Sequence, residues 1–107
     1  MINNVILVGR LVRDPEIRES QGGKSVCEIT LAVTKPFKNA TTHEYDTDFI
    51  KCTLWEHLAI NVCEYCKKGS TVGIKGRIST KNTTIDSKNI SILEIIAEKI
   101  TFISKKE

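Results

Sequence analysis

Long hydrophobic runs are missing from this sequence of 107 residues. The apolar run at residues 5–8 is far too short for the core of a secretory signal peptide or for a membrane span, and no later run is longer. The cytoplasm, where thiols stay reduced, is therefore the expected location. The length suits one compact domain and is too short for two, so we expect a single domain over residues 1–104 and a short end at residues 105–107.

Motifs for catalysis and for metal binding are scarce as well. The sequence has no glycine-rich phosphate loop, and His43 and His57 are isolated, with no Ser or Cys in a convincing nucleophile arrangement. Cys63 and Cys66 form a Cys-x-x-Cys motif, but they fall in a predicted helix and no second pair follows at zinc spacing. We expect no enzymatic activity, no cofactor and no metal, with a metal or thiol protein as a minor alternative.

Acidic residues are missing from one part of the chain. Residues 65–85 contribute five basic residues and no acidic one, so with a net charge of +3 the remainder sums to −2. The basic residues are Lys67, Lys68, Lys75, Arg77 and Lys81. This segregation favours one electropositive face that binds a polyanion, although a solvated basic edge would look the same.

The strongest functional signal is the stretch at residues 48–56, where side chains of a strand would alternate between two faces. One set is small and apolar and suits a core: Ile50, Cys52 and Leu54. The other set combines two rings with a cation and a hydroxyl: Phe49, Lys51, Thr53 and Trp55. Because an unpaired lysine is very costly to bury between two rings, the second face should contact water. A flat, cationic, aromatic face is a surface on which nucleic-acid bases stack.

Alternation and spacing predict the other elements. Strands are expected at residues 4–11, 25–34, 48–56, 71–81 and 90–103, the last with a bulge at Glu98 and Lys99. One amphipathic helix is expected at residues 56–68. Residues 35–45 should form a flexible loop that carries Phe37 between two lysines, and residues 82–89 a polar hairpin tip. The order predicts an all-β fold, a five-stranded OB-fold barrel with one α-helix between strands 3 and 4, which binds oligonucleotides or oligosaccharides around strands 2 and 3.

The first expected strand is apolar without alternation, which is typical of a strand that is covered on both sides. A small barrel covers only one side, so a second subunit is expected on the other. The candidate oligomer interface is Val5, Ile6, Leu7 and Val8. Gly9, which follows, suits a bulge or a close approach of another backbone.

Several segments, in order, match one known family. They are Asn4-Val-Ile-Leu-Val-Gly-Arg-Leu, Asp14-Pro-Glu-Ile-Arg18, Ile29-Thr-Leu-Ala-Val33, Thr47-Asp-Phe-Ile50, Lys67-Lys-Gly-Ser70 and Gly76-Arg77. From Met1 to about Phe102 the chain resembles the bacterial single-stranded DNA-binding proteins. The resemblance implies homotetramers, built as dimers of dimers joined through the first strand. It also implies single-stranded DNA wrapped around the assembly without sequence preference, in replication, recombination and repair.

The resemblance carries the family's stacking aromatics onto Phe37, Phe49 and Trp55, while a fourth falls near Thr83, where this chain has no ring. Basic contacts correspond best to Lys51 and to the cluster around Arg77 and Lys81. The full set of candidate nucleic-acid-binding residues is Phe37, Phe49, Trp55, Lys51, Lys35, Lys38, Thr34, Arg10, Lys75, Arg77 and Lys81.

Family members that organise replication continue into a linker rich in Gly, Pro and Gln and an acidic C-terminal tip that docks partner enzymes, and this sequence stops at Glu107. A natural length of 107 residues would resemble the short, tail-less members and leave no tail-mediated partners, whereas a piece of a longer protein would imply nothing. Two alternatives stay open: a protein-interaction OB-fold subunit of a replication or primosome assembly, and an RNA-binding role.

Overall fold

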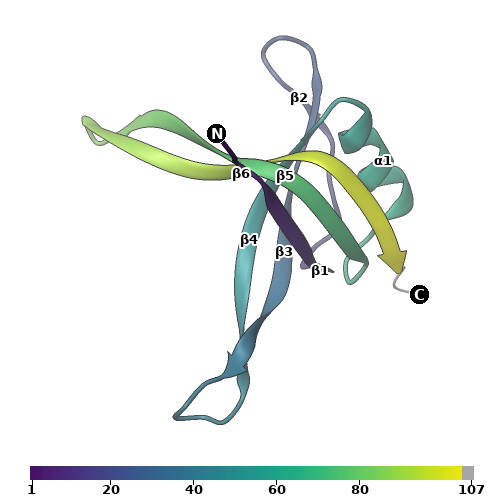
Figure 1. Ribbon diagram of the computed structural model, residues 1–107. Coiled ribbons are helices and arrows are strands. Elements are labelled where there is room, and N and C mark those ends of the chain that lie inside the picture. Colours follow the sequence, from purple (N-terminus) through teal and green to yellow (C-terminus); the bar gives the residue numbers. More distant parts are fainter. Residues whose placement is uncertain (105–107) are drawn as a thin grey trace.

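The computed structural model describes residues 1–104, a mostly β chain with six strands and one helix (Figure 1). The elements are β1 (Val5–Leu11), β2 (Arg18–Glu19), β3 (Ser25–Lys38), β4 (Tyr45–Trp55), α1 (His57–Tyr65), β5 (Thr71–Ile85) and β6 (Lys88–Ser104). The predicted short C-terminal end, residues 105–107, lies outside the described residues.

Five of the strands close into a barrel because β1 has partners on both of its edges. It pairs with β5 along most of its length and with β3 at its end, where Leu11 lies opposite Leu31. The ring continues through β6 and β4, which run parallel, and the two-residue β2 lies beside β3 outside the ring. This is the predicted OB-fold barrel, with the helix between its third and fourth long strands, β4 and β5.

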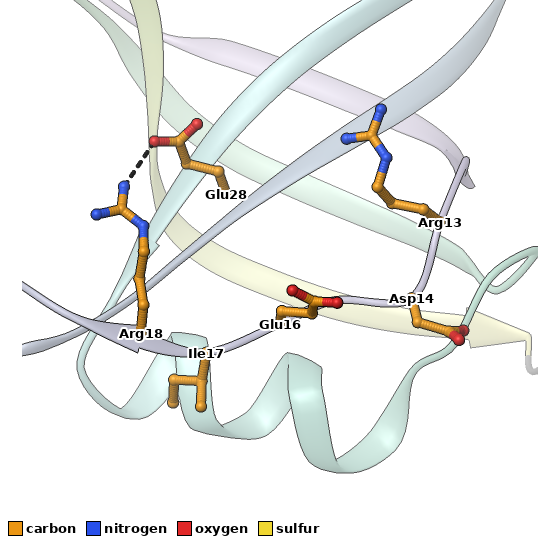
Figure 2. A pocket seen from close by; sticks show the side chains of 6 residues that line it. All are labelled: Arg13, Asp14, Glu16, Ile17, Arg18 and Glu28. Atoms are coloured by element: carbon orange, nitrogen blue, oxygen red, sulfur yellow. Dashed lines mark hydrogen bonds and ion pairs between the residues drawn. The ribbon is translucent and has the colours of Figure 1, made fainter.

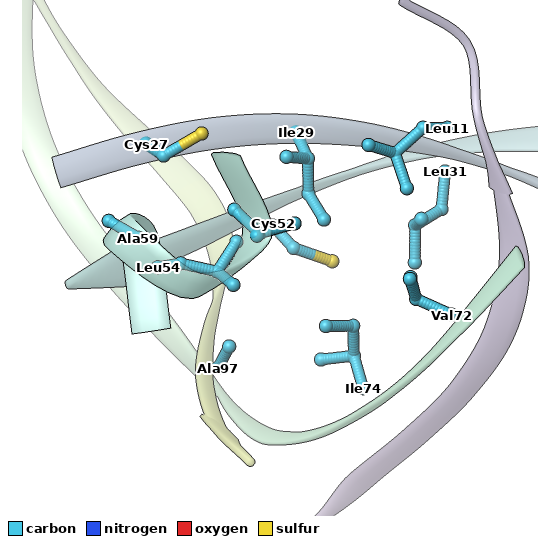
Figure 3. Close-up of a cluster of buried hydrophobic side chains, with 11 residues drawn as sticks. Leu11, Cys27, Ile29, Leu31, Cys52, Leu54, Ala59, Val72, Ile74 and Ala97 are labelled. Carbon is cyan, nitrogen blue, oxygen red and sulfur yellow. The ribbon is translucent and has the colours of Figure 1, made fainter. Parts of the chain in front are cut away.

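The core is built from the predicted apolar faces of the strands (Figure 3). The fully buried side chains of the barrel include Cys27 and Leu31 of β3, Cys52 and Leu54 of β4, and Val72 of β5. Helix α1 adds Ala59 and Val62 to this core. The close backbone approach predicted for Gly9 is confirmed, because a Cβ there would lie 2.8 Å from the carbonyl oxygen of Ala32.

The helix is shorter than predicted, and the reason is long-range. Helix α1 ends at Tyr65 and Cys66 is already extended, so the predicted last turn at residues 66–68 is not helical. The N–H of Lys67 donates to Ser70 Oγ at 3.0 Å, and the N–H of Lys68 donates to Asp14 Oδ1 at 2.7 Å. The first bond closes a local turn, and the second ties the chain to the segment after β1; together they replace a further helical turn.

Two polar stretches that lay outside the predicted strands are largely strand: the predicted loop at residues 35–45 and the predicted hairpin tip at residues 82–89. Strand β3 continues to Lys38, with a register shift after Thr34, so the predicted loop at residues 35–45 is reduced to residues 39–44. Strands β5 and β6 pair as far as Ile85 and Lys88, leaving a two-residue turn in which both residues have positive φ. Pairing in the β5–β6 hairpin is continuous up to its turn, whereas pairing of β3 with β4 is interrupted at residues 35–37 and resumes at Lys38. Both hairpins project beyond the barrel in Figure 1.

The predicted bulge in the last strand is confirmed. Lys75 pairs with Lys99 and Gly76 pairs with Ala97, so Glu98 is left as the extra residue on β6. Nearby on β1, Ile6 is 70% and Val8 is 54% exposed on the side away from the core. The second subunit expected to cover that side stays a prediction.

Candidate nucleic-acid interface

The outer side of β3 and β4 carries the rings and the cation singled out in the sequence. We call this surface the aromatic face: Phe49, Lys51 and Trp55 of β4, with their cross-strand neighbours Ala32, Thr30 and Val26 of β3. Directly paired residues point to the same side of a sheet. Phe49 is 68% and Trp55 is 37% exposed, and Lys51 is also exposed, so the rings lie outside the barrel.

One residue of that alternating set does not contact water as predicted. Thr53 is only 7% exposed. It pairs with Ile96 of β6, and its hydroxyl lies 3.5 Å from Glu94 Oε2. The reason is that β6 pairs with β4 at this point, so the longer side chains of Glu94 and Ile96 flank Thr53 and the exposed aromatic face is interrupted between Lys51 and Trp55.

A cavity of about 410 Å³ opens beside Phe49, between β4 and the β5–β6 hairpin. Its lining is mainly apolar, with one cation and one carboxylate: Phe49, Ile50, Lys51, Ile78, Leu93, Glu94 and Ile95. A flat ring that stacks on Phe49 would bury apolar surface here while a phosphate stays close to Lys51.

The candidate cations differ in whether a carboxylate already neutralises them. Lys35 is ion-paired with Asp48, and this hydrogen bond raises the pKa of Lys35. Lys81 Nζ lies 3.7 Å from Glu94 Oε2. In residues 1–104, the candidates without an ion pair to a carboxylate are Arg10, Lys38, Lys51, Lys75 and Arg77. Lys35 and Lys81 would have to exchange their partner for a phosphate.

The register brings most of the remaining candidates toward the aromatic face. Arg10 pairs with Ala32, which pairs with Phe49, so these three residues form one row across β1, β3 and β4. Thr34 lies opposite Thr47, farther along the same hairpin. Phe37, 81% exposed, and Lys38 lie on the projecting part of β3.

The β5 candidates divide into two groups. Arg77 and Lys81 pair with Ile96 and Ile92 of β6, the strand next to β4. Lys75 is instead paired with Ile6 of β1 and with Lys99, beside the exposed apolar side of β1. Lys75 is therefore the candidate that the fold does not bring to the aromatic face.

Comparison with known proteins identifies the family. Residues 2–103 match the model of the Single-strand binding protein family. The chain belongs to this family. It is 44% identical over its whole length to "Single-stranded DNA-binding protein 3" of Listeria innocua, of which it covers 67%. It is 42% identical over 99% of its length to "Single-stranded DNA-binding protein B" of Bacillus subtilis, of which it covers 94%.

In this member of the single-strand binding family, two residues near the aromatic face, Tyr45 and Arg13, were not among the candidates predicted from the sequence. Tyr45 is 53% exposed on β4, and Lys38 Nζ lies 5.8 Å from the centre of its ring. Tyr45, Phe49 and Trp55 are separated by even numbers of residues, which places them on the same face of a strand. This pattern was a signal that could have identified Tyr45. Arg13 lies in an irregular segment, where no periodicity could have placed it beside β3.

The cysteines of this family member belong to the core or its edge. Burial raises the pKa of the Cys27 thiol to about 12, with a further contribution from Cys63, whose sulfur lies 3.9 Å away. Burial also raises the pKa of Cys52 to about 11. Over residues 1–104, no group of three or more His, Cys, Asp and Glu side chains is arranged to hold a metal. In the same part of the chain, no helix is long and apolar enough to cross a membrane.

The two buried thiols predict a loss of stability in alkali. In the unfolded chain a thiol deprotonates near its ordinary pKa of 9.0, but in the fold Cys27 and Cys52 hold their protons to about 12 and about 11. Between pH 9 and these higher pKa values, the folded state therefore binds more protons than the unfolded state. The two thiols leave the stability unchanged below pH 9 and lower it as the pH rises toward 12. Urea unfolding measured from pH 7 to 11 should show this fall. Cys52→Ala should make it shallower, and an equal slope in the variant would contradict the assignment.

Proposed function

We propose that this chain binds single-stranded DNA without sequence preference and without catalysing a reaction. Bases stack on Phe37, Phe49 and Trp55, and exposed lysines and arginines neutralise the phosphates. The observation that carries the proposal is the exposure of Phe49 and Trp55 on either side of Lys51 along one strand, in a chain whose relatives are named for single-stranded DNA binding. Stacking tolerates any sequence because every base has a π-face. The expected role is to protect and organise single strands during replication, recombination and repair in the cytoplasm, at the nucleoid.

We also propose a homotetramer, a dimer of dimers. The support is the exposed apolar side of β1, where Ile6 and Val8 border a cavity of about 350 Å³ together with Gly73 and Ile103. A monomeric protein gains nothing from exposing such residues side by side, whereas a second copy would bury them. Mass measurement with and without oligo-dT gives the subunit number, and a monomer under both conditions would contradict this assembly.

The stacking role predicts a direct spectroscopic response. Trp55 is the single tryptophan of the chain, so its fluorescence reports on one position of the aromatic face. Saturating oligo-dT should quench it, because a base stacked on the indole changes its environment. The affinity should fall with salt, with a slope of about −0.7 per phosphate contacted.

A duplex of the same length is the control and should bind far more weakly. Fluorescence that stays unchanged at saturating oligo-dT would count against stacking on Trp55. Binding that is insensitive to salt and to oligonucleotide length would instead favour the protein-interaction alternative, and equal affinity for oligo-U would favour an RNA role.

A further inference from the structure

The irregular segment between β1 and β2 brings a cation to the aromatic face from the side of β3. Arg13 Nη1 lies 3.5 Å from the hydroxyl oxygen of Thr30. Thr30 is directly paired with Lys51 and is only 8% exposed. Arg13 and Lys51 therefore lie on opposite sides of one buried threonine, and Arg13 extends the row that begins on β4.

The surroundings of Arg13 leave its charge unpaired. It lines a cavity of about 320 Å³ with three carboxylates and a second arginine: Asp14, Glu16, Glu28 and Arg18, together with Ile17 (Figure 2). Glu28 is ion-paired with Arg18 at 2.8 Å, and Asp14 accepts a hydrogen bond from the Lys68 N–H. Figure 2 shows Asp14 and Arg13 pointing to opposite sides of the chain. In residues 1–104, Arg13 forms no ion pair, with Glu16 or with any other carboxylate.

We infer that the bound single strand leaves the aromatic face across β3, and that Arg13 binds one of its backbone phosphates there. This inference rests on the proposed function. Neighbouring strands of a sheet lie about 4.8 Å apart, so the step from β4 over β3 to Arg13 is roughly 10 Å, which a few extended nucleotides bridge. A guanidinium donates to phosphate through charge-assisted hydrogen bonds. Arg10, which has no ion pair and forms one row with Ala32 and Phe49, lies on the same side of β3 and supports this direction.

The test compares Arg13→Gln with Arg18→Gln by oligo-dT titration at several salt concentrations. Both arginines are exposed and line the same cavity, but Arg18 is ion-paired with Glu28, which makes it a matched control. Arg13→Gln should lower the affinity about three- to tenfold and reduce the steepness of the salt slope by about 0.7. The loss should be the same with oligo-dC, because a phosphate contact carries no sequence information. Arg18→Gln should stay within about twofold of the parent protein.

Trp55→Ala, measured in parallel, separates this inference from the proposed function. If Trp55→Ala weakens binding while Arg13→Gln leaves both the affinity and the salt slope unchanged, the path across β3 is wrong and the proposed function stands. An equal loss in Arg13→Gln and Arg18→Gln would also overturn the assignment, because it would indicate a general effect of charge. If the parent protein does not bind oligo-dT at all, the proposed function itself fails.

Discussion

Replacing Phe49 and Trp55 together by alanine should abolish most of the affinity for single strands. Each base stacked on an aromatic ring contributes about 1–3 kcal/mol, so losing two stacks should weaken binding by at least about thirtyfold. Both rings are exposed on β4 and outside the core, so the fold should persist. Because the double variant has no tryptophan, binding is measured by the anisotropy of a labelled oligo-dT.

Tyr65→Ala is the matched control, since Tyr65 is 47% exposed on α1 rather than on the aromatic face. It should bind within about twofold of the parent protein. A Phe49→Ala/Trp55→Ala variant that is folded by circular dichroism and still binds within threefold would show that the bases stack elsewhere. In that case the exposed hairpin aromatics, Phe37 and Tyr45, would be the next residues to replace.

Gly76→Ala is expected to have the largest effect on stability. A Cβ at this position would lie 2.2 Å from the carbonyl oxygen of Ile96, a backbone atom that cannot rotate away. The strands must then separate beside the bulge at Glu98, where β5 and β6 are already out of regular register. Overpacking of this kind costs about 1–3 kcal/mol, and the backbone contact favours the upper end.

Gly22→Ala, in the turn after β2 and away from the proposed subunit interface, is the control. The nearest atom to its Cβ is the hydroxyl oxygen of Ser20 at 4.0 Å, an ordinary contact distance. Urea unfolding at one fixed protein concentration, followed by circular dichroism, should give a lower midpoint for Gly76→Ala and little change for Gly22→Ala. Equal midpoints for the two variants would contradict the role assigned to the close approach at Gly76.

The sequence predicted the barrel well wherever one face of a strand is buried. Cys27, Ile29 and Leu31 alternate with polar residues, and burial requires that alternation. The strands at the hairpin ends were not predicted because both of their faces are exposed to solvent. No apolar periodicity therefore indicates that Lys38 or Ile85 belongs to a strand. The helix end was missed because Asp14, more than fifty residues away, accepts a hydrogen bond from Lys68.

The aromatic face was predictable for a different reason. A lysine between two aromatic residues of one strand has few alternatives to an exposed position, and this local constraint was sufficient for Phe49, Lys51 and Trp55. The position of Thr53 depends on the parallel strand β6, and that of Arg13 depends on the path of the chain between β1 and β2. Neither is encoded in the spacing of neighbouring residues.

The pairing of β1 has a consequence for how the chain is made. Val5 is paired with Gly76, about seventy residues later in the sequence. A chain that emerges from the ribosome therefore carries an apolar strand that lacks this partner until most of the protein has been synthesised. Such distant pairings slow folding, and an unpaired strand edge promotes aggregation in the meantime. The yield of folded protein should consequently depend on the rate of synthesis, since closure of the ring must wait for its last two strands.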